Sequence, residues 1–253
     1  MGGSHRHLLV HDEGPLHRVA PECKLAATVL FVFAVVATPK EQFWAFGVFA
    51  GMVVLAALIG RVPLSGVARR LVIEVPFLLF ALLLPLLGRD RSVEVLGLHL
   101  SAPGLWAAWN ILAKGTIGVA ASIVLASTTS VPHLLHGLER LHVPRQLVAI
   151  TGFMVRYGDV IGDELRRMRI ARESRGASGS SLGHAKAVAT SAGALFVRSY
   201  ERGERVYLAM ASRGYAGTMP VRGGQATWRS WLVCLLWPAA AAVVAATAWA
   251  VQR

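Results

Sequence analysis

The chain has very little cysteine and none of the common catalytic motifs. Its two cysteines, Cys23 and Cys234, lie 211 residues apart, and they match neither a disulfide framework nor the ligand spacing of a zinc site. A phosphate-binding loop, an H-E-x-x-H pair, a G-x-S-x-G turn and a C-x-x-C pair are all missing from the 253 residues. We therefore expect reduced thiols, no cofactor or metal bound by this chain, and no enzyme activity.

Charge is also scarce. Charged residues make up 16% of the chain, hydrophobic residues make up 55%, and the mean hydropathy is +0.53. Soluble domains are less apolar than this, so the composition predicts an integral membrane protein. Residues 1–24 contain no apolar core followed by a small-residue cleavage site, so they predict a solvated tail rather than a signal peptide. The histidines of this tail are too irregularly spaced for a metal site: His5, His7, His11 and His17.

Five apolar runs predict about five membrane helices. The first run has only 14 residues, fewer than the roughly 20 that cross a bilayer. The third run contains Glu74, which we expect near the membrane interface, and the fourth contains Lys114, which we expect to snorkel or to face an adjoining helix. The runs are residues 25–38, 43–59, 71–88, 104–131 and 231–251.

The polar segment between the fourth and fifth runs carries over half of the basic residues. Residues 131–226 hold 14 Lys or Arg and 7 Asp or Glu, so the positive-inside rule places this segment and the N-terminus in the cytoplasm. The sequence thus predicts an all-α polytopic membrane protein. Its four parts are an N-terminal cytoplasmic segment (1–24), membrane helices 1 to 4 (25–130), a cytoplasmic domain of long helices (131–226) and a C-terminal membrane helix (227–253).

A nine-residue pattern, A-x-x-S-R-G-x-x-G, occurs twice in the cytoplasmic segment. The copies begin at Ala171 and Ala209, and each follows apolar side chains spaced by three and four residues, as in an amphipathic helix. Glycine suits the left-handed position just past a helix, so one copy alone is explained equally well as a simple cap. Capping requires neither the arginine nor the alanine, so the repetition favours two docking points. Their residues are Ser174, Arg175 and Gly176, and Ser212, Arg213 and Gly214.

Two other interpretations of the polar residues are weaker. A net charge of +12 suggests nucleic acid, but the arginines alternate with acidic residues and no basic and aromatic platform is present, so we expect no nucleic-acid partner. Attraction to anionic lipid accounts for the basic residues beside the membrane. His133 and His136, near Glu139, have the spacing of a metal pair, but no third ligand follows, so we expect a polar helix face.

The sequence resembles the transmembrane (T) component of energy-coupling factor (ECF) transporters, and within that family the cobalt and nickel type called CbiQ. The resemblance covers most of the chain. It rests on an early Pro-x-x-Lys-Leu (Pro21 to Leu25), the Val143-Pro144 entry to a long helix, Arg156 in Met-Val-Arg-Tyr, and the two Arg-Gly ends. The sequence departs from the family at Ser174 and Ser212, where the family has Ala, and at Ala20 and Glu22, where it usually has Asp and Arg.

The resemblance implies a non-catalytic coupling subunit of an ATP-driven importer of cobalt or nickel in the inner (plasma) membrane. The two Ser-Arg-Gly ends would contact two ATP-binding cassette ATPase subunits, which hold the ATP and Mg²⁺. The cytoplasmic coupling domain, 131–226, would pass ATPase motion to a separate substrate-binding membrane (S) subunit. A T component of a vitamin importer remains an alternative. A membrane enzyme acting on a phosphorylated lipid, or a self-contained channel, leaves the duplicated helix end unexplained.

Overall fold

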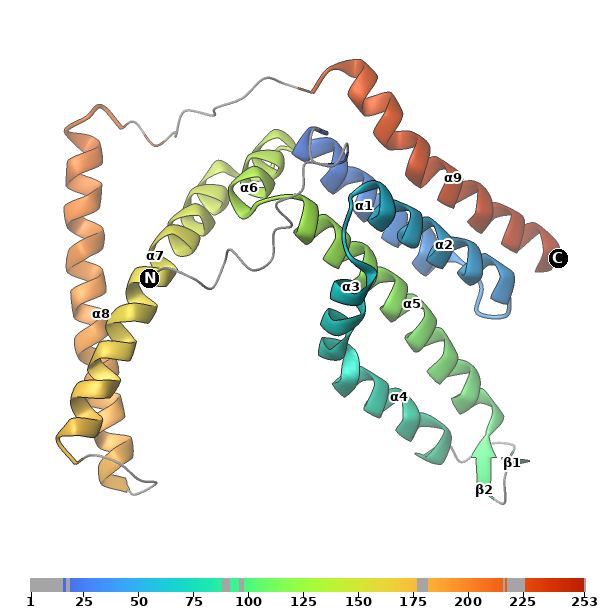
Figure 1. Ribbon diagram of the computed structural model, residues 1–253, viewed down its shortest axis with the longest axis horizontal. Coiled ribbons are helices and arrows are strands. Elements are labelled where there is room, and N and C mark those ends of the chain that lie inside the picture. The colour runs from blue at the N-terminus through green and yellow to red at the C-terminus, as the bar shows by residue number, and fades with distance from the viewer. Residues whose placement is uncertain are drawn as a thin grey trace. The chain divides into compact units, whose positions relative to one another are not determined.

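The structure is a computed structural model, and it describes residues 16, 19–87, 92–95, 98–176, 182–215, 217 and 226–252. The N-terminal histidines lie outside the described residues, so their predicted role stays a prediction. The chain forms two compact units. The larger unit contains the described residues up to 138 and from 226 onward, and the smaller unit contains those from 139 to 217. Figure 1 shows the elements of both units.

The larger unit is a bundle of helices with one small hairpin. Helix α1 packs against α9 and α5, α2 packs against α5 and α9, and α4 packs against α5. The elements are α1 Pro21–Ala37, α2 Phe43–Ile59, α3 Leu64–Arg70, the 3₁₀ turn η3 Leu71–Glu74, α4 Val75–Leu87, β1 Ser92–Val95, β2 Leu98–Ser101, α5 Ala102–Thr128, most of α6 Val131–Arg140, and α9 Trp228–Gln252.

Small residues and a few aromatic rings form the core of this bundle. Phe31 of α1 and Phe49 of α2 meet edge to face with ring centroids 5.9 Å apart. Helix α9 contributes buried alanines spaced by four and three residues, Ala241, Ala245 and Ala248, and such small side chains let neighbouring helices approach closely. Large apolar side chains instead cover the outer faces, for example Phe33 and Leu236, which are 67% and 69% exposed. An apolar exterior around a small-residue core suits a lipid environment.

Two of the described helices are long and apolar enough to cross a membrane, residues 103–128 of α5 and 228–251 of α9. Helix α2 is apolar over 17 residues, about 26 Å at 1.5 Å per residue, which is less than the 30 Å of a typical hydrocarbon core. Helix α1 has the same length. A helical membrane protein therefore agrees with the fold, whereas five full crossings remain a prediction.

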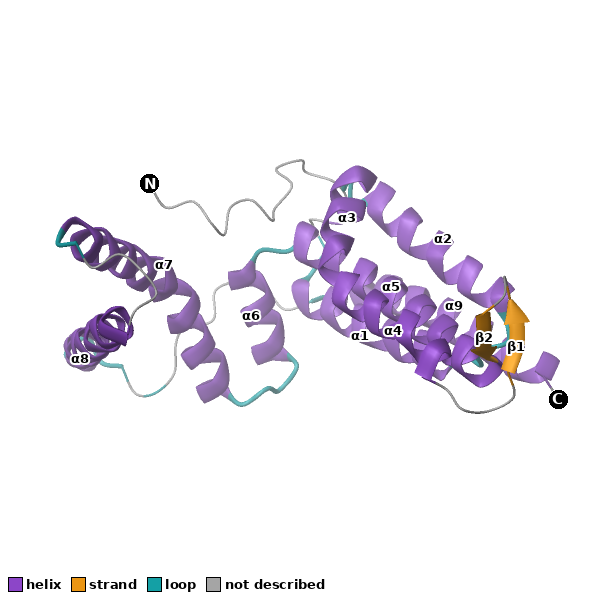
Figure 2. Ribbon diagram, turned by 90° about the horizontal axis from the view of Figure 1, so that it is seen from below, coloured by secondary structure: helices purple, strands orange, loops and turns teal. Residues whose placement is uncertain are grey.

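The predicted helical fold is confirmed, and the structure adds one short hairpin to it. Strands β1 and β2 pair antiparallel beside α4 and α5, as Figure 2 shows in orange. The strand sequences, Ser-Val-Glu-Val and Leu-His-Leu-Ser, alternate polar and apolar residues, which is the period of a half-buried strand. This alternation is the sequence signal that indicates the hairpin.

The third apolar run, in which Glu74 and two prolines predict a break, is not one continuous helix. It is divided into η3 and α4 after Glu74. Pro76 has no amide hydrogen to donate to the Val72 carbonyl, and the Val75 amide donates to that carbonyl instead. The Glu74 side chain is 6% exposed. It packs so closely on α5 that a Cβ added at Gly115 would lie 2.7 Å from Glu74 Oε1. Lys114 donates from Nζ to the Val36 carbonyl of α1 at 2.7 Å, so the prediction that it faces an adjoining helix is confirmed.

The smaller unit is a pair of long antiparallel helices (Figure 1). Helix α7 spans Arg145–Ser174 and α8 spans Leu182–Ala211, 30 residues each. The predicted long helix after Val143-Pro144 is confirmed. Glu164 of α7 accepts from Arg198 at 2.9 Å and from Arg202 at 3.3 Å, both on α8. No residue of α7 is buried, and these charged contacts add to half-buried apolar side chains of both helices, such as Phe153 and Val206.

Replacing Glu164 by Gln should loosen α7 against α8 without unfolding either helix. The hydrogen bond from Arg198, with Arg202 beside it, holds the pKa of Glu164 below its ordinary range. The charged contact is therefore present at neutral pH and is lost as pH falls through that lowered pKa. Pulsed EPR distances between spin labels on the two helices should broaden at pH 7 in Glu164→Gln, and in the wild type only in acid.

The matched control is Glu201→Gln, because the Glu201 carboxylate pairs with Arg205 of the same helix at 3.9 Å. It removes one carboxylate charge without touching a contact between the helices. Equal broadening in both variants would contradict the bridging role of Glu164.

Candidate functional site

Both copies of the repeated pattern end a helix in the same way. Gly176 follows α7 with φ of 79°, and Gly214 follows α8 with φ of 82°. These angles lie in the left-handed region, where a side chain is strained and glycine is not. The amide of Gly176 donates to the Glu173 carbonyl and that of Gly214 to the Ala211 carbonyl, each at 3.0 Å. The predicted left-handed helix ends are confirmed.

The two serines, which depart from the family pattern, are satisfied inside their own helices. Ser174 Oγ donates to the Ala171 carbonyl and Ser212 Oγ donates to the Ala209 carbonyl, each at 3.0 Å. The sequence left open what the extra hydroxyl would bind. Because each hydroxyl turns back onto its own helix, the serine adds no outward-facing donor and leaves the shape of the helix end nearly that of alanine.

The arginines at the two ends are exposed and uncommitted. All six residues of the predicted docking points are exposed: Ser174, Arg175, Gly176, Ser212, Arg213 and Gly214. Neither Arg175 nor Arg213 has an ion pair with any described residue, whereas Arg169 binds Glu173 at 2.7 Å. A guanidinium in this state keeps its five donors for a carboxylate or carbonyl groups of another molecule.

The two ends lie far apart on the smaller unit. Because α7 and α8 are antiparallel, their C-terminal ends are at opposite ends of the pair (Figure 1). Each helix of 30 residues is about 45 Å long. The arrangement therefore offers two separate contact points with the same local chemistry, and it does not build a single composite pocket from them.

The first turn of α1 forms a second group of contacts, which sequence reasoning missed. Glu22 Oε1 accepts from the Ala226 amide at 3.0 Å, and Lys24 Nζ donates to the Thr128 carbonyl at the end of α5 at 3.1 Å. Gly137 of α6 lies so close that a Cβ there would come within 3.1 Å of the Glu22 amide nitrogen. We call Pro21, Glu22 and Lys24 the α1 anchor.

The α1 anchor holds both places where the chain leaves the larger unit for the smaller one. Helix α6 precedes α7, and Ala226 precedes α9, so the two exits are fastened to one turn of one helix. The Glu22 and Lys24 side chains are 3% and 7% exposed. The sequence signal for these contacts was the pair of charged residues at the start of an apolar run. Charged residues in such a place are buried only when backbone or side-chain groups bind them.

The remaining candidates take structural roles. Ser130 Oγ hydrogen-bonds with Nδ1 of His133, and the described residues contain no group of three metal-ligating side chains. The hydrogen bond of His133 and its exposed side chain fit the predicted polar helix face around His133 and His136. Cys23 and Cys234 are free thiols that lie near each other where α1 packs against α9, a proximity that their positions in the sequence did not indicate.

Comparison with known proteins gives a family match over most of the chain. The family model CbiQ, described as a cobalt transport protein, matches residues 12–222. An uncharacterized protein of Methanocaldococcus jannaschii, MJ1571, is 24% identical over 213 residues, covering 81% of this chain and 72% of that protein. The energy-coupling factor transporter transmembrane protein EcfT of Heliobacterium modesticaldum is 26% identical over 219 residues, covering 81% of each chain.

A third relative joins two proteins in one chain. The putative fused cobalt transport protein CbiMQ of Methanocorpusculum labreanum is 27% identical over 109 residues, covering 43% of this chain and 18% of that protein.

Replacing Gly137 by Ala should destabilise the larger unit, because the new Cβ would press on the backbone of Pro21 and Glu22, which cannot rotate away. Gly118→Ala in α5 is the matched control, since a Cβ there meets nothing within 4 Å. Both changes gain about 1 kcal/mol of helix propensity, so their difference isolates the contact, about 1–3 kcal/mol. Thermal unfolding in detergent should give a lower Tm for Gly137→Ala, and equal Tm values would contradict the close contact.

Proposed function

Since the chain belongs to the CbiQ family of cobalt transport proteins, we propose that it is the coupling subunit of an ATP-driven ECF importer. Family membership makes it a transmembrane transport component that works with other subunits, and not an enzyme. The proposal adds the partners. Two ATPase subunits bind the two Ser-Arg-Gly ends, and a separate S subunit in the membrane binds the solute.

The observation that carries this proposal is the pair of identical, exposed helix ends at opposite ends of α7 and α8. A contact that evolved for one partner needs one such end, whereas two copies of an ATPase need two. Each end combines a glycine without a side chain, which allows a close approach, with an arginine beside it that has no ion pair among the described residues. An arginine fork in that setting binds carboxylate or carbonyl oxygens with directional hydrogen bonds.

The apolar side chains of α7 and α8 support a unit that works inside a complex. Exposed apolar patches of this extent on a polar segment mark interaction surfaces. The helices also border a cavity of about 450 Å³ lined by Tyr157, Tyr207 and Met210 among others. The residues at least half exposed are Leu147, Ile150, Met154, Leu165, Ile170, Phe196, Val197, Tyr200, Tyr207 and Leu208.

The proposed route of motion follows the chain itself. When the ATPases close on ATP, they move the ends of α7 and α8. Four residues separate the end of α6 from the start of α7, and the chain after α8 continues to Ala226, so both connections transmit displacement to the α1 anchor. From the α1 anchor the displacement passes to α5 through the hydrogen bond of Lys24, and to α9 through the face of α1 that packs against it. ATP and Mg²⁺ belong to the partner ATPases in this scheme, and this chain binds neither.

The proposed orientation follows the charges. The basic residues of 131–226 place the smaller unit in the cytoplasm by the positive-inside rule, with the chain in the inner (plasma) membrane and the N-terminus inside. About five crossings are part of the proposal, and the third of them combines η3 with α4, the shortest of these helices at 13 residues.

The proposed solute is a cobalt ion, with nickel next. The family model and the fused CbiMQ relative carry cobalt transport in their names. The EcfT relatives leave a vitamin importer as the alternative. The solute site itself is proposed to lie in the S subunit.

Replacing Arg175 and Arg213 by Ala should release the ATPases or uncouple their hydrolysis from transport. Each arginine is expected to behave as an interface hot spot, with about tenfold or greater loss of ATPase binding per substitution. The control is Arg169→Ala with Arg205→Ala, two exposed arginines paired along their own helices. Quantitative co-purification measures the first effect and solute uptake in vesicles the second. Unchanged co-purification and uptake in the double variant would refute the proposal.

Stimulation of ATP hydrolysis by the complete reconstituted assembly should identify the solute. We expect Co²⁺ to raise the rate in proteoliposomes, Ni²⁺ to act more weakly, and Mg²⁺ beyond that needed for ATP to add nothing. Each ion is tested alone, with an assembly lacking the S subunit as the control. Stimulation by a vitamin and by no metal ion would contradict the cobalt assignment and leave the coupling role untouched.

A further inference from the structure

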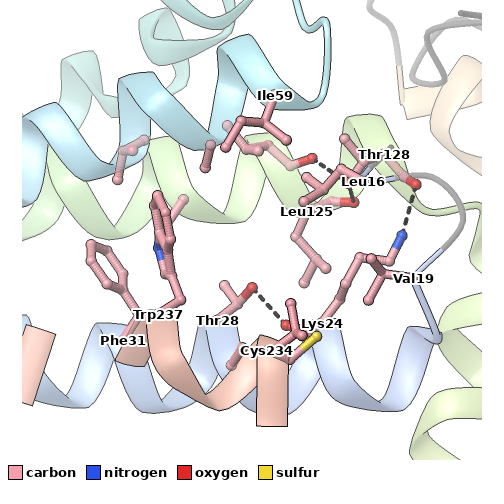
Figure 3. A pocket seen from close by; sticks show the side chains of 16 residues that line it. Leu16, Val19, Lys24, Thr28, Phe31, Ile59, Leu125, Thr128, Cys234 and Trp237 are labelled. Atoms are coloured by element: carbon pink, nitrogen blue, oxygen red, sulfur yellow. Dashed lines mark hydrogen bonds between the residues drawn. The ribbon is translucent and has the colours of Figure 1, made fainter. Parts of the chain in front are cut away.

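A cavity of about 340 Å³ lies among α1, α2, α5 and α9 in the larger unit. Its walls are apolar over most of their extent, and Figure 3 shows Phe31 and Trp237 at one end and Leu125, Leu16 and Val19 toward the other. Thr28 does not offer its hydroxyl to the cavity, because Oγ1 donates to the Lys24 carbonyl at 2.9 Å. An apolar space of this size in a membrane protein suits a hydrocarbon chain better than water.

Among the described residues that line this cavity, Lys24 is the only cation. Lys24 is 7% exposed, and its Nζ donates to the Thr128 carbonyl at 3.1 Å, at the end of the cavity away from Trp237 (Figure 3). An ammonium group has three donors, so this bond leaves two. No carboxylate of the described residues pairs with Lys24, and the nearby Glu22 Oε1 accepts from Ala226. A buried cation without a counter-charge is costly unless an anion joins it.

We propose that the cavity binds one acyl chain of an anionic phospholipid, with the lipid phosphate at the Lys24 amino group. The combination of apolar walls and one buried cation at one end is complementary to a molecule with a hydrocarbon tail and an anionic head. Lys24 lies in the first turn of α1, where the apolar run begins and the polar N-terminal segment ends. That is the level at which a phospholipid presents its phosphate, so a phospholipid fits this end better than a molecule immersed wholly in the hydrocarbon.

The lipid would bind against the α1 anchor. Lys24 belongs to that turn, and its present partner, the Thr128 carbonyl, ends α5. A phosphate at Lys24 neutralises the buried charge and stiffens the junction of α1 and α5. Binding of the lipid does not depend on the proposed coupling function. Only its effect on transport does, so the binding experiment stands if the function proves different.

Trp237 lines the cavity and reports its occupant by fluorescence. The full-length chain is reconstituted in phosphatidylcholine bilayers that contain either phosphatidylglycerol or phosphatidylcholine with brominated acyl chains, which quench tryptophan on contact. The Trp237 signal is the difference between the wild type and Trp237→Phe. We compare the mole fraction of each brominated lipid that halves the Trp237 signal. The mole fraction for phosphatidylglycerol should be about one third, or less, of that for phosphatidylcholine. Equal quenching by the two lipids would overturn the anionic assignment.

Lys24→Gln should abolish the preference for phosphatidylglycerol, and Lys24→Arg should restore it. Lys114→Gln is the matched control, because Lys114 also donates to a backbone carbonyl at 2.7 Å but does not line the cavity. Its preference should equal that of the wild type. A loss of preference in Lys114→Gln as large as that in Lys24→Gln would show a general charge effect and overturn the site.

Ala56→Leu keeps the charge and fills the cavity, since Ala56 is one of its lining residues. It should weaken quenching of Trp237 by both brominated lipids, whereas an unchanged signal would show that no chain enters the cavity. Brominated free fatty acid, added to phosphatidylcholine bilayers, distinguishes the source of the chain. Quenching by the fatty acid at lower mole fraction than by phosphatidylglycerol would overturn the phospholipid assignment.

Discussion

The structure depends on one turn of helix in which two buried charges are held by backbone groups. The Glu22 carboxylate accepts a hydrogen bond from the Ala226 amide, and the Lys24 amino group donates one to the Thr128 carbonyl. Three segments distant in the sequence therefore meet at the start of α1. Buried charges tolerate few alternative arrangements, because each loses its hydration and must keep the partners that replace it. Apolar helices in lipid gain little from burial against one another, so these polar contacts fix the register of the bundle.

The helix ends of the smaller unit obey a different physical rule. Backbone groups that a helix leaves unsatisfied must be bonded near its end, and the left-handed glycines with the returning serine hydroxyls do this locally. Because these helix-end groups are bonded without the arginine side chains, Arg175 and Arg213 are available to bind another molecule. Stability and recognition therefore use neighbouring atoms without competing for them.

Much of the fold follows from the sequence where the signal is local. The apolar run 43–59 coincides with α2, the run 104–131 with most of α5, and the glycines of the repeat take the conformation that the pattern predicts. The third run is divided after Glu74, where Pro76 lacks the amide hydrogen that an α-helix would donate to the Val72 carbonyl, and average hydropathy does not report such a local effect. The β1–β2 hairpin is indicated in the sequence by the alternation of polar and apolar residues, a signal that our prediction did not use.

The contacts of the α1 anchor could not be predicted in this way. Glu22 and Ala226 are 204 residues apart, and nothing in the local sequence of either indicates the other. The same holds for the proximity of Cys23 and Cys234, since hydropathy states that a segment is apolar but not which segment lies beside it.

The antiparallel course of α7 and α8 has a mechanical consequence. Glu164 precedes Arg175 by 11 residues and Arg202 precedes Arg213 by 11, so the ionic bridge sits between two arms of about 16 Å each. Opposite forces on the two arginines produce a torque about that bridge, and parallel forces only shift it.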